Sequence, residues 1–242
     1  MKTIKVRGIV LREFEAGESD KRLVIFCKEH GRLLVYARGA RKPSSKFMAA
    51  AQLFTYADFV LAKGQGFHSL TQAEVIKNFY ALRQDYDRLM SAHLIAEVCE
   101  KTLLDNIESD TLLLLVLRSL DTLAKDMYLP IQVSCVFLTR FFDVFGLRPQ
   151  TDACILCNTP VSEIKTKALC AEGIVCEAHK PAASLRISDT AVHAIDHICD
   201  SNLTQSFMFN ATQGLLTELQ NAALFLWRCH FEITLKTKFI EE

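Results

Sequence analysis

The chain has 242 residues, half of them apolar and 23% charged, which is typical of a folded globular protein and excludes a disordered or fibrous one. Its formal net charge of zero argues by itself against a nucleic-acid-binding protein. The charge is unevenly spread, however. Residues 1–77 hold 14 Lys and Arg against 7 Asp and Glu, a net of +7, and residues 78–242 carry a net of −7. This asymmetry predicts a basic domain, suited to a polyanion, joined to an acidic one.

The N-terminus, MKTIKVRGIV, lacks the apolar core of a signal peptide. The leucine-rich run 112–117 is far shorter than the roughly 20 residues that span a bilayer. We therefore expect a cytoplasmic protein that contacts no membrane. In that reducing compartment the nine cysteines should not form disulfides, so metal binding, packing or catalysis must account for them.

The first 78 residues predict a small barrel. Apolar alternation and turn signals place strands over residues 2–14, 22–26, 33–37, 53–62 and 67–76. Five short strands suit a closed barrel of the OB type, and a five-stranded SH3-like barrel fits almost as well. Residues 1–78 are expected to form this domain.

A basic loop follows the third strand. The segment GRLLVYARGARKPSSK, residues 31–46, contains no acidic residue, and its Gly, Pro and Ser favour turns. Lys and Arg pair with any phosphate oxygen, so such a loop can bind a polyanion without reading bases. The alternative is a solvated surface loop. The candidate phosphate-binding residues are Arg38, Arg41, Lys42 and Lys46, with Lys21 and Arg22 in support.

Aromatic residues of the barrel are candidates to stack nucleic-acid bases. They are Phe14, Tyr36, Phe54, Tyr56, Phe59 and Phe67. Such residues more often fill a core, and the sequence does not choose among them.

From Phe79 the apolar period becomes helical. Helices are predicted over residues 82–104, 110–127, 130–144, 189–200 and 214–236. Asp110 is placed to cap the second, while Pro130 starts the third and Gly146 stops it. We expect these helices to pack into one bundle, formed by residues 79–150 and 185–242.

Residues 151–184 show neither period, and cysteines cluster there. Cys154 and Cys157 form a C-x2-C knuckle, and Cys176 and His179 form a C-x2-H knuckle after 18 intervening residues. This is the ligand spacing of a four-coordinate structural zinc. Cys170 is the alternative fourth ligand to His179. The segment is therefore predicted to be a zinc module inserted into the helical domain.

Catalysis is not expected. The only His-x-Glu, at residues 230–232, lies downstream of the Cys pair rather than upstream as in a nucleobase deaminase. Four protein ligands would also leave no open metal position for water. His193 and His197 share a helical face but lack the Glu of a zinc protease, so they are expected to be ordinary helix residues. The remaining cysteines, Cys27, Cys99, Cys135, Cys199 and Cys229, are expected to pack in the core.

The chain contains several short motifs in a specific order and at specific spacings. They are Gly8-Ile9-Val10-Leu11, Gly17-Glu18-Ser19-Asp20, Glu29-His30-Gly31-Arg32, Arg38-Gly39-Ala40-Arg41-Lys42, Phe145-Gly146-Leu147-Arg148-Pro149 and Cys154-Ile155-Leu156-Cys157. Through them the chain resembles, from end to end, the bacterial RecO family of recombination mediators. The resemblance implies an α+β multidomain protein, with an N-terminal OB-fold barrel and a C-terminal α-helical domain that contains a zinc module.

The resemblance also implies a function. Family members bind single- and double-stranded DNA and anneal complementary strands. With RecR they help RecA load onto strands coated by single-stranded-DNA-binding protein (SSB), which implies a location at the nucleoid. Their helical domain receives the acidic, apolar C-terminal tail of SSB in a groove edged by basic residues, for which Arg118 and Arg140 are the candidates here.

The chain departs from the family in two places. The family usually has a Gly-Gly pair before the second knuckle and often four cysteines, whereas Glu172-Gly173 and His179 stand here. Some relatives have lost the metal, so the ligand residues themselves must carry the zinc assignment. Two rival functions are an RNA-binding OB-fold zinc protein acting in translation or ribosome assembly, and a zinc-dependent hydrolase, for which no general base can be named.

Overall fold

The computed structural model describes residues 2–64, 66–103 and 108–237. The chain divides into two compact units, Met1–Lys125 and Asp126–Glu242. The finer domain boundaries expected from the sequence, at residues 78, 150 and 184, stay predictions.

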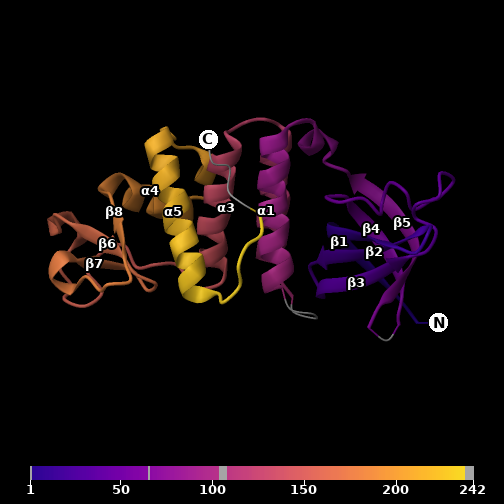
Figure 1. Ribbon diagram of the computed structural model, residues 1–242, viewed down its shortest axis with the longest axis horizontal. Helices are drawn as coiled ribbons and strands as arrows, with labels where there is room; N and C mark the ends of the chain where they lie inside the picture. The colour runs from indigo at the N-terminus through magenta and orange to yellow at the C-terminus, as the bar shows by residue number, and fades with distance from the viewer. Residues whose placement is uncertain (1, 65, 104–107, 238–242) are drawn as a thin grey trace. The chain divides into compact units, whose positions relative to one another are not determined.

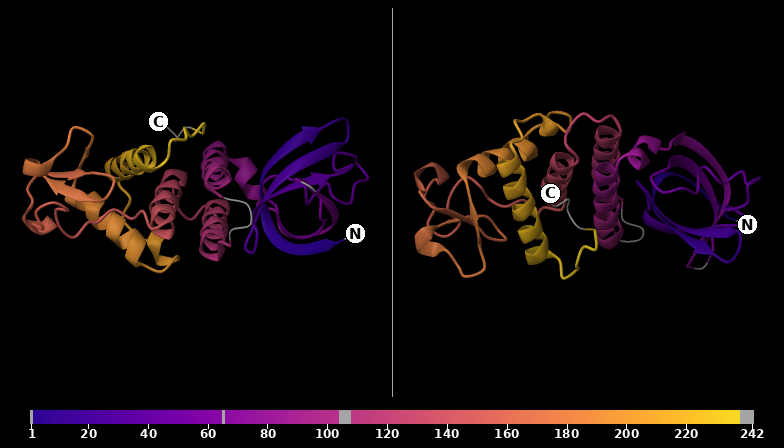
Figure 2. Two further views of the ribbon diagram at one scale, coloured as in Figure 1. Left: turned by 90° about the horizontal axis from the view of Figure 1, so that it is seen from below. Right: turned by 45° about the horizontal axis from the view of Figure 1, so that its top comes forward.

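The first unit contains a closed barrel of five strands (Figures 1 and 2). The strands are β1 (Thr3–Ala16), β2 (Asp20–Cys27), β3 (Gly31–Ala37), β4 (Tyr56–Ala62) and β5 (His68–Lys77). They follow the order β1-β2-β3-β5-β4, and β3 and β5 pair in parallel. Each strand overlaps its predicted range, although β4 begins at Tyr56 rather than at residue 53, because Phe54 has a left-handed φ of 61° that interrupts the extended conformation. The predicted closed five-stranded barrel of OB type is confirmed.

Strand β1 closes the barrel because it pairs with β2 along one part and with β4 along the other. A register shift between Val10 and Arg12 marks a bulge, which bends a strand and increases its twist. At Gly8 a Cβ atom would lie 2.5 Å from the carbonyl oxygen of Phe26, so only glycine fits this close approach.

Two α-helices complete the first unit, α1 (Tyr86–Thr102) and α2 (Asp110–Ala124), after a short 3-10 helix, η1 (Tyr80–Gln84). The predicted first helix is thus interrupted at Asp85, which caps α1 by accepting a hydrogen bond from the backbone N–H of Arg88 at 2.9 Å. The predicted Leu104 end lies outside the described residues. Asp110 is the first residue of α2 rather than its cap, because Ser109 occupies the cap position and the Asp110 carboxylate pairs with Lys28 at 3.0 Å.

Helix α1 covers part of the outer barrel face. Ile9 and Phe26 lie opposite one another on β1 and β2, on the side away from the barrel core, and are nevertheless fully buried. The Phe54 ring packs against the His93 ring of α1 in a T-shaped arrangement, with 5.5 Å between the ring centroids. Apolar packing against the helix therefore accounts for outward-facing apolar residues on these strands.

The second unit contains α3 (Pro130–Val144), α4 (Asp189–Asp200) and α5 (Gln213–His230), which contact one another. Pro130 starts α3 as predicted, and Gly146 follows its end with a φ of 69°. Helix α5 ends at His230, earlier than predicted, because the chain turns back and the indole N–H of Trp227 donates to the carbonyl of Ile233 at 2.7 Å.

Three short strands stand between α3 and α4, where the sequence predicted no regular element. They are β6 (Lys167–Leu169), β7 (Ile174–Cys176) and β8 (Leu185–Ile187), in one antiparallel sheet of order β7-β6-β8. Strands of three residues are too short to show an alternation. Figures 1 and 2 show this sheet beside α4 and α5.

Helices α1 and α2 belong to the first unit and α3–α5 to the second. The prediction of one bundle formed by all five helices therefore stays a prediction. In the described part of the chain, no helix combines the length and the apolar character that crossing a bilayer requires.

Candidate metal centre and basic surface

The first knuckle is a tight turn that follows α3. The backbone N–H of Cys154 donates to the carbonyl of Thr159 at 2.9 Å, and the N–H of Asn158 donates to the carbonyl of Cys154 at the same distance. Asn158 has a φ of 56°, a left-handed conformation that asparagine tolerates well. The turn brings the thiols of Cys154 and Cys157 close to Cys176 of the second knuckle.

The second knuckle lies at the end of β7. Cys176 is the last residue of the strand, and a single 3-10 turn, η3 (Glu177–His179), brings the ring of His179 back beside it. The His179 Nδ1 atom lies 3.2 Å from the Cys176 Sγ atom. The strand is joined to the first knuckle by the backbone N–H of Ile155, which donates to the carbonyl of Ile174 at 3.0 Å.

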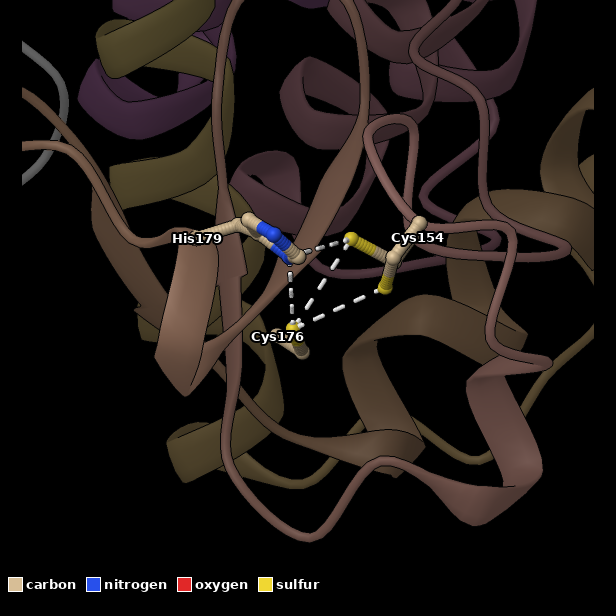
Figure 3. A group of neighbouring side chains, drawn as sticks. Cys154, Cys176 and His179 are labelled. Atoms are coloured by element: carbon tan, nitrogen blue, oxygen red, sulfur yellow. Dashed lines mark hydrogen bonds between the residues drawn. The ribbon is translucent and has the colours of Figure 1, made fainter.

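The ligand atoms of Cys154, Cys157, Cys176 and His179 all lie within 4.8 Å of one another. Figure 3 shows three of these side chains converging. The Cys176 Sγ atom lies 3.9 Å from the Sγ atoms of both Cys154 and Cys157, and the Cys154 Sγ atom lies 3.8 Å from the His179 Nδ1 atom. A tetrahedral zinc, with Zn–S of about 2.3 Å and Zn–N of about 2.0 Å, requires S–S edges of about 3.8 Å and S–N edges of about 3.5 Å. The group therefore fits a tetrahedral metal ion of this size.

Backbone hydrogen bonds stabilise the thiolate form of Cys154. Burial disfavours the charged form of Cys154, but backbone hydrogen bonds from Cys176, Leu156 and Cys157 outweigh it and lower the pKa of Cys154 to about 6. Burial, and hydrogen bonds with the neighbouring thiols, raise the pKa of Cys176. Since a metal binds the thiolate form, the Cys154 environment favours a metal ligand.

Of the six cysteines outside the two knuckles, five are buried and one is exposed. Cys170, the alternative fourth ligand, is buried just after β6 and is not part of the group, which contains His179. Cys27, Cys99, Cys135 and Cys199 are buried as predicted. The prediction for Cys229 is wrong: it is exposed on α5, where its neighbours Leu226 and Trp227 face the core instead.

The predicted basic loop is part of the turn-rich connection from β3 to β4, residues 38–55. Arg38, Lys42 and Lys46 are exposed there, and within the described ranges they form no ion pair with a carboxylate. Arg41 differs, because it pairs with Glu15 at 3.0 Å and donates to the carbonyl of Gly17 at 3.2 Å.

The two supporting residues also differ from each other. Lys21 is half-buried, pairs with Glu13 at 2.5 Å and donates to the carbonyl of Ala51 at 3.0 Å. Arg22 is exposed, and its guanidinium lies 5.7 Å from the centre of the Phe14 ring. Of the six predicted phosphate-binding residues, four are therefore exposed and form no ion pair with a described carboxylate: Arg22, Arg38, Lys42 and Lys46.

The sequence missed a network that holds this loop. The Asp20 carboxylate accepts hydrogen bonds from the Tyr36 hydroxyl at 2.6 Å and from the backbone N–H of Gly39 at 2.7 Å. These bonds, with that of Tyr36 the strongest, lower the pKa of Asp20. The signal was present as two motifs, GESD and RGARK, but only the fold shows that they meet.

The two candidate groove residues lie in different units. On α3, the Arg140 guanidinium donates to the carbonyls of Cys199 and Ser201 at the end of α4 and to Asp143 at 3.3 Å. Its positive charge stabilises that helix end. On α2, the Nε atom of Arg118 is buried and has no hydrogen-bond partner among the described residues.

Comparison with known proteins gives matches along nearly the whole chain. A family model described as "Recombination protein O N terminal" matches residues 1–79, and one described as "Recombination protein O C terminal" matches residues 83–239. The "DNA repair protein RecO" of Acetivibrio thermocellus is 33% identical over 90% of this chain and 88% of its own length. Proteins with the same description from Halalkalibacterium halodurans and Bacillus mycoides are 32% and 30% identical, over 64% and 79% of this chain and 61% and 77% of their own lengths.

Proposed function

Because the chain belongs to the RecO family, and so has a role in DNA repair, we propose that it binds single- and double-stranded DNA and anneals complementary strands. With RecR it would help RecA load onto strands coated by SSB. Such a protein works in the cytoplasm, at the nucleoid. It acts by binding, and no catalytic step is part of the proposal.

The observation that carries this proposal is the exposed positive charge of Arg38, Lys42 and Lys46. Two DNA strands repel each other, and cations that neutralise their phosphates offset this repulsion without regard to sequence. Loop side chains reach phosphates of either strand, which supports binding of both single strands and duplexes. Arg41 and Lys21, which pair with Glu15 and Glu13, contribute mainly by holding the loop.

We assign a structural zinc to Cys154, Cys157, Cys176 and His179. Four protein ligands complete a tetrahedral coordination sphere, which leaves no position for a reacting water. When bound, the ion would hold the two knuckles together, since the strands around them are only three residues long. This supports a structural role and argues against the hydrolase alternative.

The proposed partner of the helical residues is the acidic C-terminal tail of SSB. Arg140 already donates to three acceptors of its own unit, so Arg118, whose half-exposed side chain forms no ion pair with a described residue, is the stronger candidate to meet an acidic group. A fluorescent tail peptide should bind the Arg118→Glu variant more weakly than it binds the unchanged protein. Unchanged binding removes Arg118 from the proposal.

The direct experiment is strand annealing. Complementary dye-labelled oligonucleotides are coated with SSB and mixed with the protein, with and without RecR, and duplex formation is followed by energy transfer. We expect faster annealing with the protein and, in a parallel assay with RecR, faster RecA assembly. No acceleration on either naked or coated DNA would contradict the proposal, and tighter binding to structured RNA than to DNA would favour the RNA-binding alternative.

A further inference from the structure

We infer that Cys157 is an oxidation site: a hydroperoxide joins it to Cys176 in a disulfide and so removes two of the four metal ligands. The inference rests on the zinc assigned under the proposed function and adds a reaction of that site with an oxidant. It concerns the second unit alone and does not depend on DNA binding.

Solvent reaches the ligand sulfurs to different extents. Cys154 is fully buried and Cys176 is half-buried, whereas Cys157 is exposed. The chain neighbours of Cys157, Leu156 and Asn158, are exposed as well. A small oxidant therefore reaches the Cys157 sulfur most easily. Exposure is one of the two requirements of a redox-sensitive cysteine, and thiolate character is the other.

Metal binding supplies the thiolate character, because a coordinated thiol is deprotonated. The Thr159 hydroxyl lies 3.1 Å from the Cys157 Sγ atom. It donates to this sulfur once the proton is lost, since a thiolate can only accept a hydrogen bond. The contact holds the Cys157 side chain at the surface of the module. Both requirements for oxidation thus meet in one residue.

A second thiol lies beside Cys157 to complete a disulfide. The Cys176 Sγ atom is 3.9 Å from the Cys157 Sγ atom, and a disulfide requires an approach to about 2.05 Å. Cys157 lies in the turn of the first knuckle, and Cys176 lies where β7 passes into η3. Cys176 is equally close to Cys154, at 3.9 Å, but Cys154 is fully buried. Exposure therefore selects the pair of Cys157 and Cys176.

The reaction takes two steps. The Cys157 thiolate attacks one oxygen of the peroxide, so that an S–O bond forms, the O–O bond breaks and the departing oxygen takes up a proton. The Cys176 thiolate then attacks the Cys157 sulfur, the S–S bond forms, and the S–O bond breaks as hydroxide leaves and takes up a proton. With hydrogen peroxide, two thiolates, one peroxide and two protons become one disulfide and two water molecules. The two sulfurs supply the two electrons that reduce the peroxide.

The other cysteines do not compete well for the oxidant. Of the nine cysteines, only Cys157 and Cys229 are exposed. Burial, together with the nearby Glu172 carboxylate, raises the pKa of Cys229, so this residue remains a thiol, and the thiol is the less reactive form. The five cysteines outside both groups are buried: Cys27, Cys99, Cys135, Cys170 and Cys199.

Oxidation leaves Cys154 and His179 as the remaining ligands, and two ligands do not make the four-coordinate site of a structural zinc. The ion is therefore released. The new disulfide still ties one residue of each knuckle to the other, so the change in the fold is expected to be local. It should be largest around Cys154 and His179, which lose their common partner.

The test adds hydrogen peroxide in slight molar excess to the purified, zinc-loaded full-length protein and follows zinc release with a chromogenic chelator. We expect loss of about one zinc per chain, with a disulfide between Cys157 and Cys176 located by tandem mass spectrometry. Hydrogen exchange should rise around Cys154 and His179. A reductant together with added zinc should restore the thiols, the bound zinc and the original exchange.

Two variants serve as controls. Cys229→Ser removes the other exposed thiol, and Cys170→Ala removes a buried thiol outside the ligand group, so both should release zinc at the rate of the unchanged protein. Zinc that stays bound under peroxide, or that leaves without a disulfide between Cys157 and Cys176, overturns the inference. A purified protein that contains no zinc would instead overturn the metal assignment of the proposed function.

Discussion

The Tyr36 hydroxyl donates a hydrogen bond of 2.6 Å to the carboxylate of Asp20, and the backbone N–H of Gly39 donates to the same carboxylate at 2.7 Å. Gly39 has a φ of 66°, a left-handed conformation that glycine adopts without strain. One side chain at the start of β2 thus orients the first turn of the basic loop. A second link, from the backbone N–H of Arg41 to the carbonyl of Ser19 at 2.9 Å, joins the same two segments.

Replacing this carboxylate should loosen the loop. In Asp20→Ala the Gly39 N–H and the Tyr36 hydroxyl lose their acceptor. We expect a lower urea midpoint and faster amide hydrogen exchange across residues 38–46, together with weaker DNA binding. Glu18→Ala, at an exposed position in the turn just before β2, is the matched control and should change none of these quantities. Unchanged exchange in Asp20→Ala would show that Asp20 does not hold the loop.

The same contact predicts a pH dependence. Hydrogen bonds lower the pKa of Asp20 in the folded protein, so the native state favours the ionised carboxylate. This contribution is fully present above the ordinary aspartate pKa of about 3.9 and is lost as the pH falls through the folded pKa. Urea midpoints measured from neutral to acidic pH should therefore decline less steeply in Asp20→Asn than in the unchanged protein. Parallel declines would argue that the contact makes no ionisation-dependent contribution.

The metal assignment predicts about one zinc per chain in the purified protein, measured by elemental analysis. Cys154→Ser and His179→Ala should each lose stoichiometric zinc and lower the thermal midpoint. A chelator should increase hydrogen exchange across residues 151–187 before the rest of the chain opens, because the metal contributes folding free energy there.

Cys170→Ala is the control for this experiment, because Cys170 is buried nearby but lies outside the ligand group. It should keep its zinc. Loss of zinc from Cys170→Ala together with its retention in His179→Ala would make Cys170 the fourth ligand after all. Absence of zinc from the unchanged protein would remove the metal altogether.

A buried hydrogen bond in the second unit gives a stability prediction. The amide of Gln132 on α3 donates to the carbonyl of Phe207 at 2.9 Å, and both groups are buried. Gln132→Leu leaves that carbonyl unpaired, which should lower the free energy of unfolding by about 1–3 kcal/mol. Gln220→Leu, at a half-buried position of α5, should have a much smaller effect. Equal effects of the two changes in urea unfolding would contradict this explanation.

The sequence predicted most elements because they are long enough to show a period. The strands of the barrel alternate, and helix α4 runs from Asp189 to Asp200 as expected. The strands β6, β7 and β8 were not predicted, because three residues cannot show an alternation of apolar and polar side chains. The early end of α5 was not predicted, because it depends on the hydrogen bond between the Trp227 side chain and the Ile233 carbonyl.

The sequence predicted which residues form the metal group, but it did not predict which cations of the basic loop pair with carboxylates. Ligand spacing alone identified the four residues that now converge, including His179. In the basic loop the sequence could not separate Arg38, which is exposed, from Arg41, which pairs with Glu15 on a distant strand. Such pairings join residues that are far apart in sequence, so no local pattern reports them.

The central claim is that the exposed cations of the basic loop bind DNA phosphates. It is tested most directly by the salt dependence of single-strand affinity in Arg38→Ala/Lys42→Ala/Lys46→Ala. The matched control, Lys2→Ala/Lys5→Ala/Lys63→Ala, removes the same charge from exposed lysines elsewhere on the barrel. Each lost phosphate contact should lower the slope of log K against log salt by about 0.7. We expect the loop variant to lose about two units of slope and the control to lose little. Equal slopes in the loop variant and the unchanged protein would contradict the account.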